Sequence, residues 1–418
     1  MERTLGDSHN FGRRVTALGD RIVKPRTVVW ERLILSADSP LRCLLRDAAD
    51  KDGLGADAFE FLPSLQISPS PEGPGGEVER VDLSPLPALS ADDKRALATL
   101  TGRFIALASF LGIGDLHWEN LVLGKDARGR TVLAPLDVEL ILDDMELPTE
   151  TKLLPEADPE YADVCRHAAG IRRVLPYLGK PISPGDLVAM AAAYRGALAF
   201  LERHAGEIAS VFSELPNLSE TPIRVCLRGT GDYVQALALT GSSHEESLWP
   251  PLLEEEAIQL ARGDIPYFFR LYGKQGIHYY TDPDLRTWGT LPTEGDVPQL
   301  ASLLKISRAF RSSSRRRLRE EGLFTLLGAF DHRSYTGTFA SDDVEVTFRG
   351  RTLILKLGDE ELESRRDMSD FVGSVYLPCL CGEVLTPFVP EKTRCEPRAP
   401  VQKGRVQKGE RRSNVRRS

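Results

Sequence analysis

The sequence predicts an α+β protein in which helices are mixed with antiparallel strand pairs. Two patterns lead to this class. Short β-rich runs flank tight turn signals, as at Gly19-Asp20 and at 349–351, and a longer run with apolar residues at helical spacing covers 90–111. This mixture favours α+β over a doubly wound parallel sheet. With 418 residues, the chain can form one large domain or two unequal ones.

Composition and charge narrow the class of protein further. The chain is 41% apolar and 27% charged, carries a net charge of -8, and has no apolar run long enough to span a bilayer. Its N-terminus lacks the apolar segment of a secretory signal, so we expect a cytoplasmic protein with no membrane span. An acidic chain also argues against a dedicated nucleic-acid binder.

The C-terminal end differs from the rest of the chain. Residues 391–418 are rich in Lys and Arg and poor in apolar side chains, which predicts a disordered basic tail. Contact of this tail with nucleic acid or an acidic peptide is the alternative. Nearby, Cys379, Cys381 and Cys395 have no fourth ligand at a familiar zinc spacing, so we expect free thiols there rather than a metal site.

The elements are predicted in order along the chain. Residues 10–29 predict a strand, a tight turn around Gly19-Asp20 and a second strand over 21–26, and a helix follows from Trp30. The Pro-, Gly- and Ser-rich stretch from Leu62 to Pro87 is interpreted as a linker or surface loop. Ser90, with Asp93 three residues later, predicts the start of a helix that ends at Gly112. Further elements are a hairpin of 121–123 with 131–136, a helix over 184–203, a strand over 223–227, and a hairpin of 344–348 with 352–356.

A cluster of polar residues surrounds the first of these hairpins. Asp115, His117 and Asn120 lie on the loop that enters it, and Asp137 and Glu139 follow its second strand. Phosphoryl transfer needs an oriented hydroxyl, hard oxygen ligands for Mg²⁺ and a cation on the phosphates, because charge must be neutralised.

In this interpretation Asp115 orients or deprotonates the acceptor, and Asn120 and Asp137 hold Mg²⁺. His117 holds the loop or contacts phosphate, and Lys24 neutralises the phosphates. Each residue alone has an ordinary structural explanation: a capped turn, a surface lysine or a strand-end cap. Their order along the chain favours a kinase-like site.

Several motifs resemble those of one family, the dehydration domain of class II lanthipeptide synthetases. The motifs are Leu5–Gly12 with Lys24-Pro25-Arg26, Gly114–Asn120, Ile223–Tyr233 and Gly263–Phe268, in family order. The resemblance covers about residues 5–270, and no comparable signature follows. By structure alone, Ile223–Tyr233 could be a core strand, and the Asp264 segment is interpreted as a turn that packs two aromatic residues.

The resemblance implies a lipid-kinase-like, two-lobed catalytic core with helical additions. It implies ATP- and Mg²⁺-dependent phosphorylation of Ser and Thr in a ribosomal precursor peptide, followed by phosphate elimination, so that the domain is both kinase and lyase. It assigns six residues to ATP and metal and two to elimination, with Arg228 and Tyr233 as weaker candidates for the second step. The six are Lys24, Asp115, His117, Asn120, Asp137 and Glu139, and the two are Arg224 and Thr230.

The resemblance also implies a division of the chain. We expect N-lobe-like strands, a helix and the linker over 1–88, a C-lobe-like catalytic and elimination region over 89–390, and the tail over 391–418. The family's preceding segment and zinc cyclase have no counterpart, so the precursor peptide would pass to a separate cyclase. Two alternatives stay open: a phosphotransferase without elimination, and a truncated pseudoenzyme or binding partner.

Overall fold

The computed structural model describes residues 2–155, 169–239, 252–292 and 318–363, except 72, 144, 180, 273, 320, 331–333, 350–351 and 359. Within these ranges the strands of all four sheets pair antiparallel with their neighbours, which confirms the predicted mixture of helices and antiparallel strands. No helix among the described residues is both long enough and apolar enough to cross a membrane. The predicted basic tail and Cys379, Cys381 and Cys395 lie outside the described residues.

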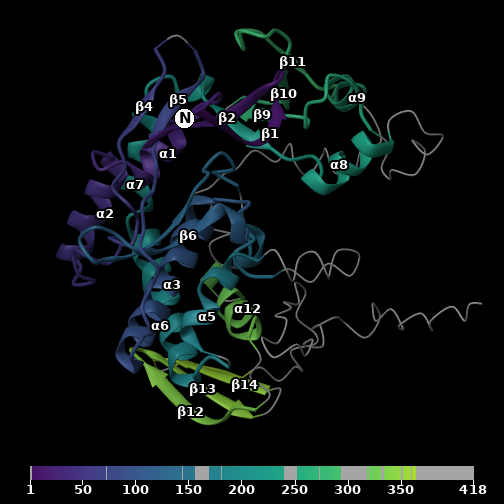
Figure 1. Ribbon diagram of the computed structural model, residues 1–418. Helices are drawn as coiled ribbons and strands as arrows, with labels where there is room; N and C mark the ends of the chain where they lie inside the picture. Colours follow the sequence, from purple (N-terminus) through teal and green to yellow (C-terminus); the bar gives the residue numbers. More distant parts are fainter. Residues whose placement is uncertain are drawn as a thin grey trace, which may run out of the picture.

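The N-terminal part forms a five-stranded sheet with two helices beside it (Figure 1). The strand order is β1-β2-β3-β5-β4, and the predicted turn at Gly19 joins β2 to β3. Gly19 has a φ of 62°, which favours glycine. The elements are β1 (Glu2–His9), β2 (Arg13–Leu18), β3 (Arg21–Lys24), α1 (Val29–Leu35), α2 (Pro40–Lys51), β4 (Ile67–Pro69) and β5 (Gly76–Glu79).

The interpretation of 62–87 as a linker is wrong, because β4 and β5 lie within it and complete this sheet. Proline is tolerated here because Pro69 ends an edge strand, where a missing N–H costs no sheet hydrogen bond. Gly76 pairs with Lys24 on β3, and any side chain at position 76 would overlap the Val28 side chain. The same residues that suggest a linker are therefore those that let this hairpin pack closely.

Two long helices form the centre of the molecule. The predicted capping box of Ser90 and Asp93 starts α3 (Ala91–Leu111), and Gly112, with a φ of 62°, ends it. α3 packs along α6 (Pro184–Arg203), where Gly102 faces the backbone of Met190 with no room for a Cβ atom. The other helices of this region are α5 (Leu175–Leu178), α7 (Ala205–Ser213), α12 (Gly322–Gly328), and the 3₁₀ helices η1 (Trp118–Asn120), η2 (Pro148–Thr151), η3 (Gly170–Arg173) and η4 (Leu218–Glu220).

The predicted hairpin after α3 is confirmed as β6 (Leu121–Lys125) paired with β7 (Thr131–Pro135). Its inner strand is buried against the helical core. The 114–120 loop enters this hairpin and Asp137 leaves it, as predicted. The backbone N–H of Leu136 donates to the carbonyl of Asn120 at 2.8 Å, so the two polar segments start side by side.

A second sheet lies beside β1 and β2, although it comes much later in the sequence (Figure 1). Its order is β11-β10-β9-β8, and the predicted strand over 223–227 is confirmed as β8. The elements are β8 (Pro222–Val225), α8 (Thr230–Leu239), α9 (Glu254–Ala261), β9 (Phe268–Leu271), β10 (His278–Tyr280) and β11 (Trp288–Thr290).

Asp264 joins this second sheet to the β1–β2 turn. Its buried carboxylate accepts hydrogen bonds from the hydroxyl of Ser8 at 2.7 Å and from the backbone N–H groups of Phe11 and Gly12 at 2.8 and 2.9 Å. The turn has three successive positive φ values at residues 10–12, which point its N–H groups to one side. The predicted turn lies one position earlier, at Arg262 and Gly263, and Asp264 leads instead into β9, which begins at Phe268.

The third sheet packs on α6 at the opposite end of the molecule (Figure 1). The predicted hairpin is confirmed as β13 and β14, in register over six residue pairs. The strands are β12 (Thr336–Ser341), β13 (Val344–Arg349), β14 (Thr352–Leu357) and β15 (Glu360–Glu363).

Candidate functional site

Lys24, at the end of β3, is surrounded by hydrogen-bond acceptors. Its Nζ atom is 2.9 Å from Oε1 of Glu31 on α1, 3.1 Å from Oδ1 of Asp137 and 3.0 Å from the carbonyl oxygen of Leu136. Burial lowers the pKa of Lys24, and the Glu31 carboxylate opposes that shift. The structure thus brings together the predicted lysine and the predicted aspartate from positions over a hundred residues apart.

Arg26 pairs with the same two carboxylates as Lys24 and links them to Glu139. Its Nη2 atom is 2.6 Å from Oε1 of Glu31 and also pairs with Asp137, and its Nε atom is 2.8 Å from Oε2 of Glu139. The other carboxylate oxygen of Glu139 pairs with Arg224 on β8. Backbone geometry reinforces this pair, because the N–H of Arg224 donates to the carbonyl of Glu139 at 2.8 Å.

These six side chains form one continuous set of ion pairs, called here the charge network. Burial alone would raise the pKa of Glu139, but Arg224 and Arg26 outweigh burial and lower the pKa to about 2. Burial is likewise outweighed at Glu31, whose pKa is lowered by Arg26 and Lys24. Three cations therefore face three carboxylates, which is how buried charge is tolerated. The members are Lys24, Arg26, Glu31, Asp137, Glu139 and Arg224.

The 114–120 loop is built differently, around Asp115. This residue has a φ of 56°, and its backbone carbonyl and Oδ2 both accept from Nδ2 of Asn120, at 2.9 and 3.3 Å. His117 lies with Nε2 3.9 Å from Oδ1 of Asp115, while its Nδ1 accepts from the backbone N–H of Glu119 at 3.3 Å. Asp115 and Asn120 are thus hydrogen-bonded within one loop, and His117 caps the 3₁₀ helix η1 inside it.

Asp115 also lies within electrostatic reach of the charge network. Partial burial raises the pKa of Asp115, with His117 and Arg224 acting in the opposite direction and Glu139 adding to the rise. A carboxylate with a raised pKa binds a proton more tightly, which suits a group that must accept one. The Asp115 carboxylate of the loop is therefore close enough to Arg224 and Glu139 of the charge network to be affected by their charges.

Asn120 and Asp137 fit a magnesium ion in part. Asn120 uses its Nδ2 on Asp115, which leaves its Oδ1 as an acceptor, and both ion pairs of Asp137 run through Oδ1. Within the described ranges no three His, Cys, Asp or Glu side chains cluster as a complete metal site. One or two protein oxygens suit Mg²⁺ in phosphoryl transfer, where phosphate and water supply the remaining ligands.

Thr230 is placed less closely than the other predicted residues. It is exposed at the first position of α8, and no contact joins it to Arg224 in the described structure. The weaker candidates have structural partners instead: Glu256 accepts from Arg228 at 2.9 Å and from the hydroxyl of Tyr233 at 2.6 Å. These two bonds fix the start of α8 to α9.

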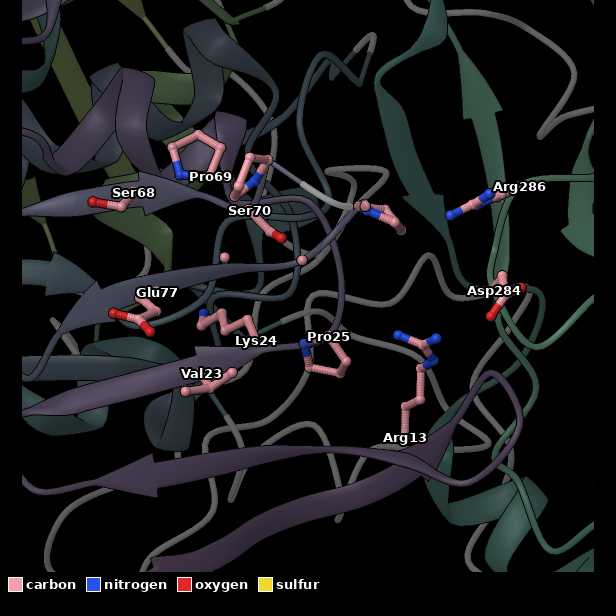
Figure 2. Close-up of a pocket in the computed structure, with 15 residues that line it drawn as sticks. Arg13, Val23, Lys24, Pro25, Ser68, Pro69, Ser70, Glu77, Asp284 and Arg286 are labelled. Carbon is pink, nitrogen blue, oxygen red and sulfur yellow. The ribbon is translucent and has the colours of Figure 1, made fainter.

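A cleft of about 1050 Å³ opens beside Lys24 (Figure 2). One wall is the β4–β5 turn at 68–76, which has glycines at 73, 75 and 76. Figure 2 shows Arg13 and Arg286 approaching from β2 and from the β10–β11 turn on the other side. A cleft of this volume accommodates a small ligand, and glycines let backbone N–H groups approach phosphate.

Sequence reasoning missed Glu31, Arg26 and His9. Glu31 is buried while the neighbouring charged residue Arg32 is exposed, so no local pattern in the sequence distinguishes it. Nδ1 of His9 donates to the carbonyl oxygen of Ile265 at 2.7 Å, and burial followed by the charge of Arg224 lowers the pKa of His9. The partner of His9 is 256 residues away, so no local pattern identifies it.

No family model and no curated protein matches this chain. Functional interpretation therefore depends on the arrangement of the side chains described above.

Proposed function

We propose that the protein transfers the γ-phosphoryl group of ATP to Ser or Thr of a ribosomal precursor peptide and then eliminates phosphate, as in lanthipeptide biosynthesis. The observation that carries the proposal is the pairing of Lys24 with Asp137 next to the Asp115 loop, because Leu136 accepts from Lys24 and donates to Asn120 of that loop. Arg224 lies within electrostatic reach of Asp115. A lysine on the third strand that pairs with a glutamate of the following helix is also the arrangement of protein kinases.

The overall architecture supports a two-lobed, lipid-kinase-like core under this proposal. The N-terminal sheet supplies Lys24, and the helical half supplies the 114–120 loop through α3 and the β6–β7 hairpin. The polar residues come from both halves, as a nucleotide site between two lobes requires.

In the first step, Asp115 accepts the proton of the Ser or Thr hydroxyl as its oxygen gains the phosphoryl group. ATP would supply that group and leave as ADP, and Mg²⁺ would neutralise charge on the phosphates. Asn120 and Asp137 would hold the metal, Lys24 would contact phosphate oxygens, and His117 keeps the loop in shape. Glu139, with both oxygens on arginines, would act here by positioning Arg26 and Arg224 rather than by binding metal directly.

In the second step, a base removes the Cα proton of the phosphorylated residue, the Cα–Cβ double bond forms and the Cβ–O bond breaks. Arg224 stabilises the departing phosphate, because a guanidinium matches phosphate geometry. Thr230 follows six residues later, at the start of α8, and is the second residue assigned to this step.

Mass spectrometry of a Ser- and Thr-containing precursor peptide incubated with ATP and Mg²⁺ tests the proposal. Loss of one water per modified residue is expected from the unaltered protein, and a stable phosphate adduct from an Arg224→Met variant. An unchanged peptide mass with no ADP formed would contradict the proposal and favour a binding partner without activity.

A phosphotransferase without elimination is the second candidate. It is favoured by the placement of Thr230, which has no described contact with Arg224, and by the ion pair that holds Arg224 to Glu139. This candidate predicts stable phosphate adducts from the unaltered protein and no change in them when Thr230 is replaced.

A further inference from the structure

Two apolar side chains at the candidate site are exposed to solvent. In the described part of the chain, six large hydrophobic residues are exposed, and two of them, Trp118 and Leu136, lie in the segments that carry Asp115 and Asp137. Their side chains are 38% and 39% accessible. A single exposed apolar residue is common on protein surfaces, but an aromatic side chain beside the candidate site is the kind of anchor that dominates binding energies.

Trp118 is held in place rather than left mobile. Arg173 donates from Nε to the carbonyl oxygen of Trp118 at 2.6 Å, and its guanidinium carbon lies 4.8 Å from the centre of the indole ring. This stacking covers part of the indole and fixes its orientation. A fixed and partly open aromatic ring loses little entropy when a ligand packs against it.

Leu136 is tied to the same loop. Its N–H donates to the carbonyl of Asn120 at 2.8 Å, and its own carbonyl accepts from Lys24 at 3.0 Å. Trp118 precedes Asn120 by two positions, so both apolar residues are anchored through the backbone that places Asn120. Trp118 is also three positions from Asp115, where the acceptor hydroxyl must lie.

We infer that Trp118 and Leu136 form the docking surface for an apolar side chain next to the acceptor Ser or Thr in the peptide substrate. This inference rests on the proposed function. An extended peptide advances about 3.3–3.6 Å per residue, so a neighbour of the acceptor lies within one or two residues' length of Asp115. The two exposed residues therefore select sequences by the chemistry of that neighbour.

Two peptides that differ only in the residues flanking one Ser, Leu in one and Gln in the other, test the inference. With ATP and Mg²⁺, the Leu peptide should show a KM about tenfold lower, the scale at which apolar contacts discriminate. Trp118→Ala should remove this preference and leave the KM for ATP unchanged, and Leu136→Ala should reduce it. Trp288→Ala, a matched control at an exposed tryptophan on the far edge strand β11, should keep it.

Calorimetric titration of both peptides without nucleotide gives a readout independent of turnover. Preferential binding of the Leu peptide that Trp118→Ala abolishes supports the inference even where no peptide is phosphorylated, an outcome that would overturn only the proposed function. Equal binding of both peptides, or a preference that survives Trp118→Ala, overturns the inference. A raised KM for ATP in Trp118→Ala also overturns it, because the indole would then serve the nucleotide.

Discussion

The charge network and the 114–120 loop meet at one site but are built in opposite ways. In the network, Lys24, Glu31 and Glu139 are nearly inaccessible and every charge has a partner. In the loop, the Asp115 side chain is 45% accessible and makes a few local contacts. A buried network is costly to disturb, because removal of one charge leaves another unpaired. The comparison indicates that the network fixes the local architecture, whereas the loop leaves its carboxylate accessible.

The largest effect is expected in the loop. Asp115→Asn keeps the shape of the side chain but removes the group that accepts the proton, so the rate of phosphoryl transfer should fall about 1000-fold, within the range of general-base catalysis. ADP release with peptide and Mg²⁺ measures this rate. The melting temperature should not change, as for the exposed control Asp92→Asn. If Asp115→Asn instead lowers the melting temperature as much as the loss of a network charge does, the loop and the network do not differ in their structural role.

Removing a charge from the charge network is expected to lower the stability of the protein. Glu139→Gln leaves the guanidinium groups of Arg26 and Arg224 without their shared carboxylate, which should lower the free energy of unfolding by roughly 3–5 kcal/mol. Urea denaturation measures this change. Glu214→Gln, an exposed glutamate at the end of α7, is the control and should be neutral. If both variants unfold at the same urea concentration, the charge network does not stabilise the fold.

Lowering the pH should affect the 114–120 loop and the charge network at different pH values. Glu139 has a folded-state pKa of about 2, below its ordinary value of 4.5, so its stabilising contribution is present above pH 4.5 and is lost as pH falls toward 2. The pKa of Asp115 is raised above 3.8, so the base is protonated at a higher pH than Glu139. Phosphoryl transfer should therefore fall on acidification while circular dichroism still reports a folded protein. Loss of both at the same pH would contradict this order.

The smallest expected effect concerns His117, whose Nδ1 accepts from the N–H of Glu119. His117→Ala should destabilise the protein by about 1 kcal/mol, the usual cost of losing such a cap, and His117→Asn by less, because Asn also caps. Thermal unfolding of both variants measures the difference. Equal melting temperatures would assign the histidine to substrate or phosphate rather than to the loop.

Sequence predicted the local features well and the distant partnerships poorly. Ser90 and Asp93 define the start of α3 within four residues, and the loop that holds Asp115 is recognisable in the same way. β5 instead pairs with β3, more than fifty residues earlier, so its Pro- and Gly-rich surroundings suggest a linker. The charge network depends on β8 reaching Glu139, which no spacing in the sequence encodes. Motif order grouped Lys24, Asp115 and Asp137 as candidates, but tertiary packing decided which charges meet.

The first turn of the chain depends on a residue encoded far downstream. The N–H groups of Phe11 and Gly12 are satisfied by Asp264, so a nascent chain still growing on a ribosome must leave them to water until that aspartate is synthesised. The N-terminal sheet should therefore consolidate late in translation, after most of the helical half has formed. C-terminal truncations that remove position 264 would leave this hairpin unanchored and open to proteases.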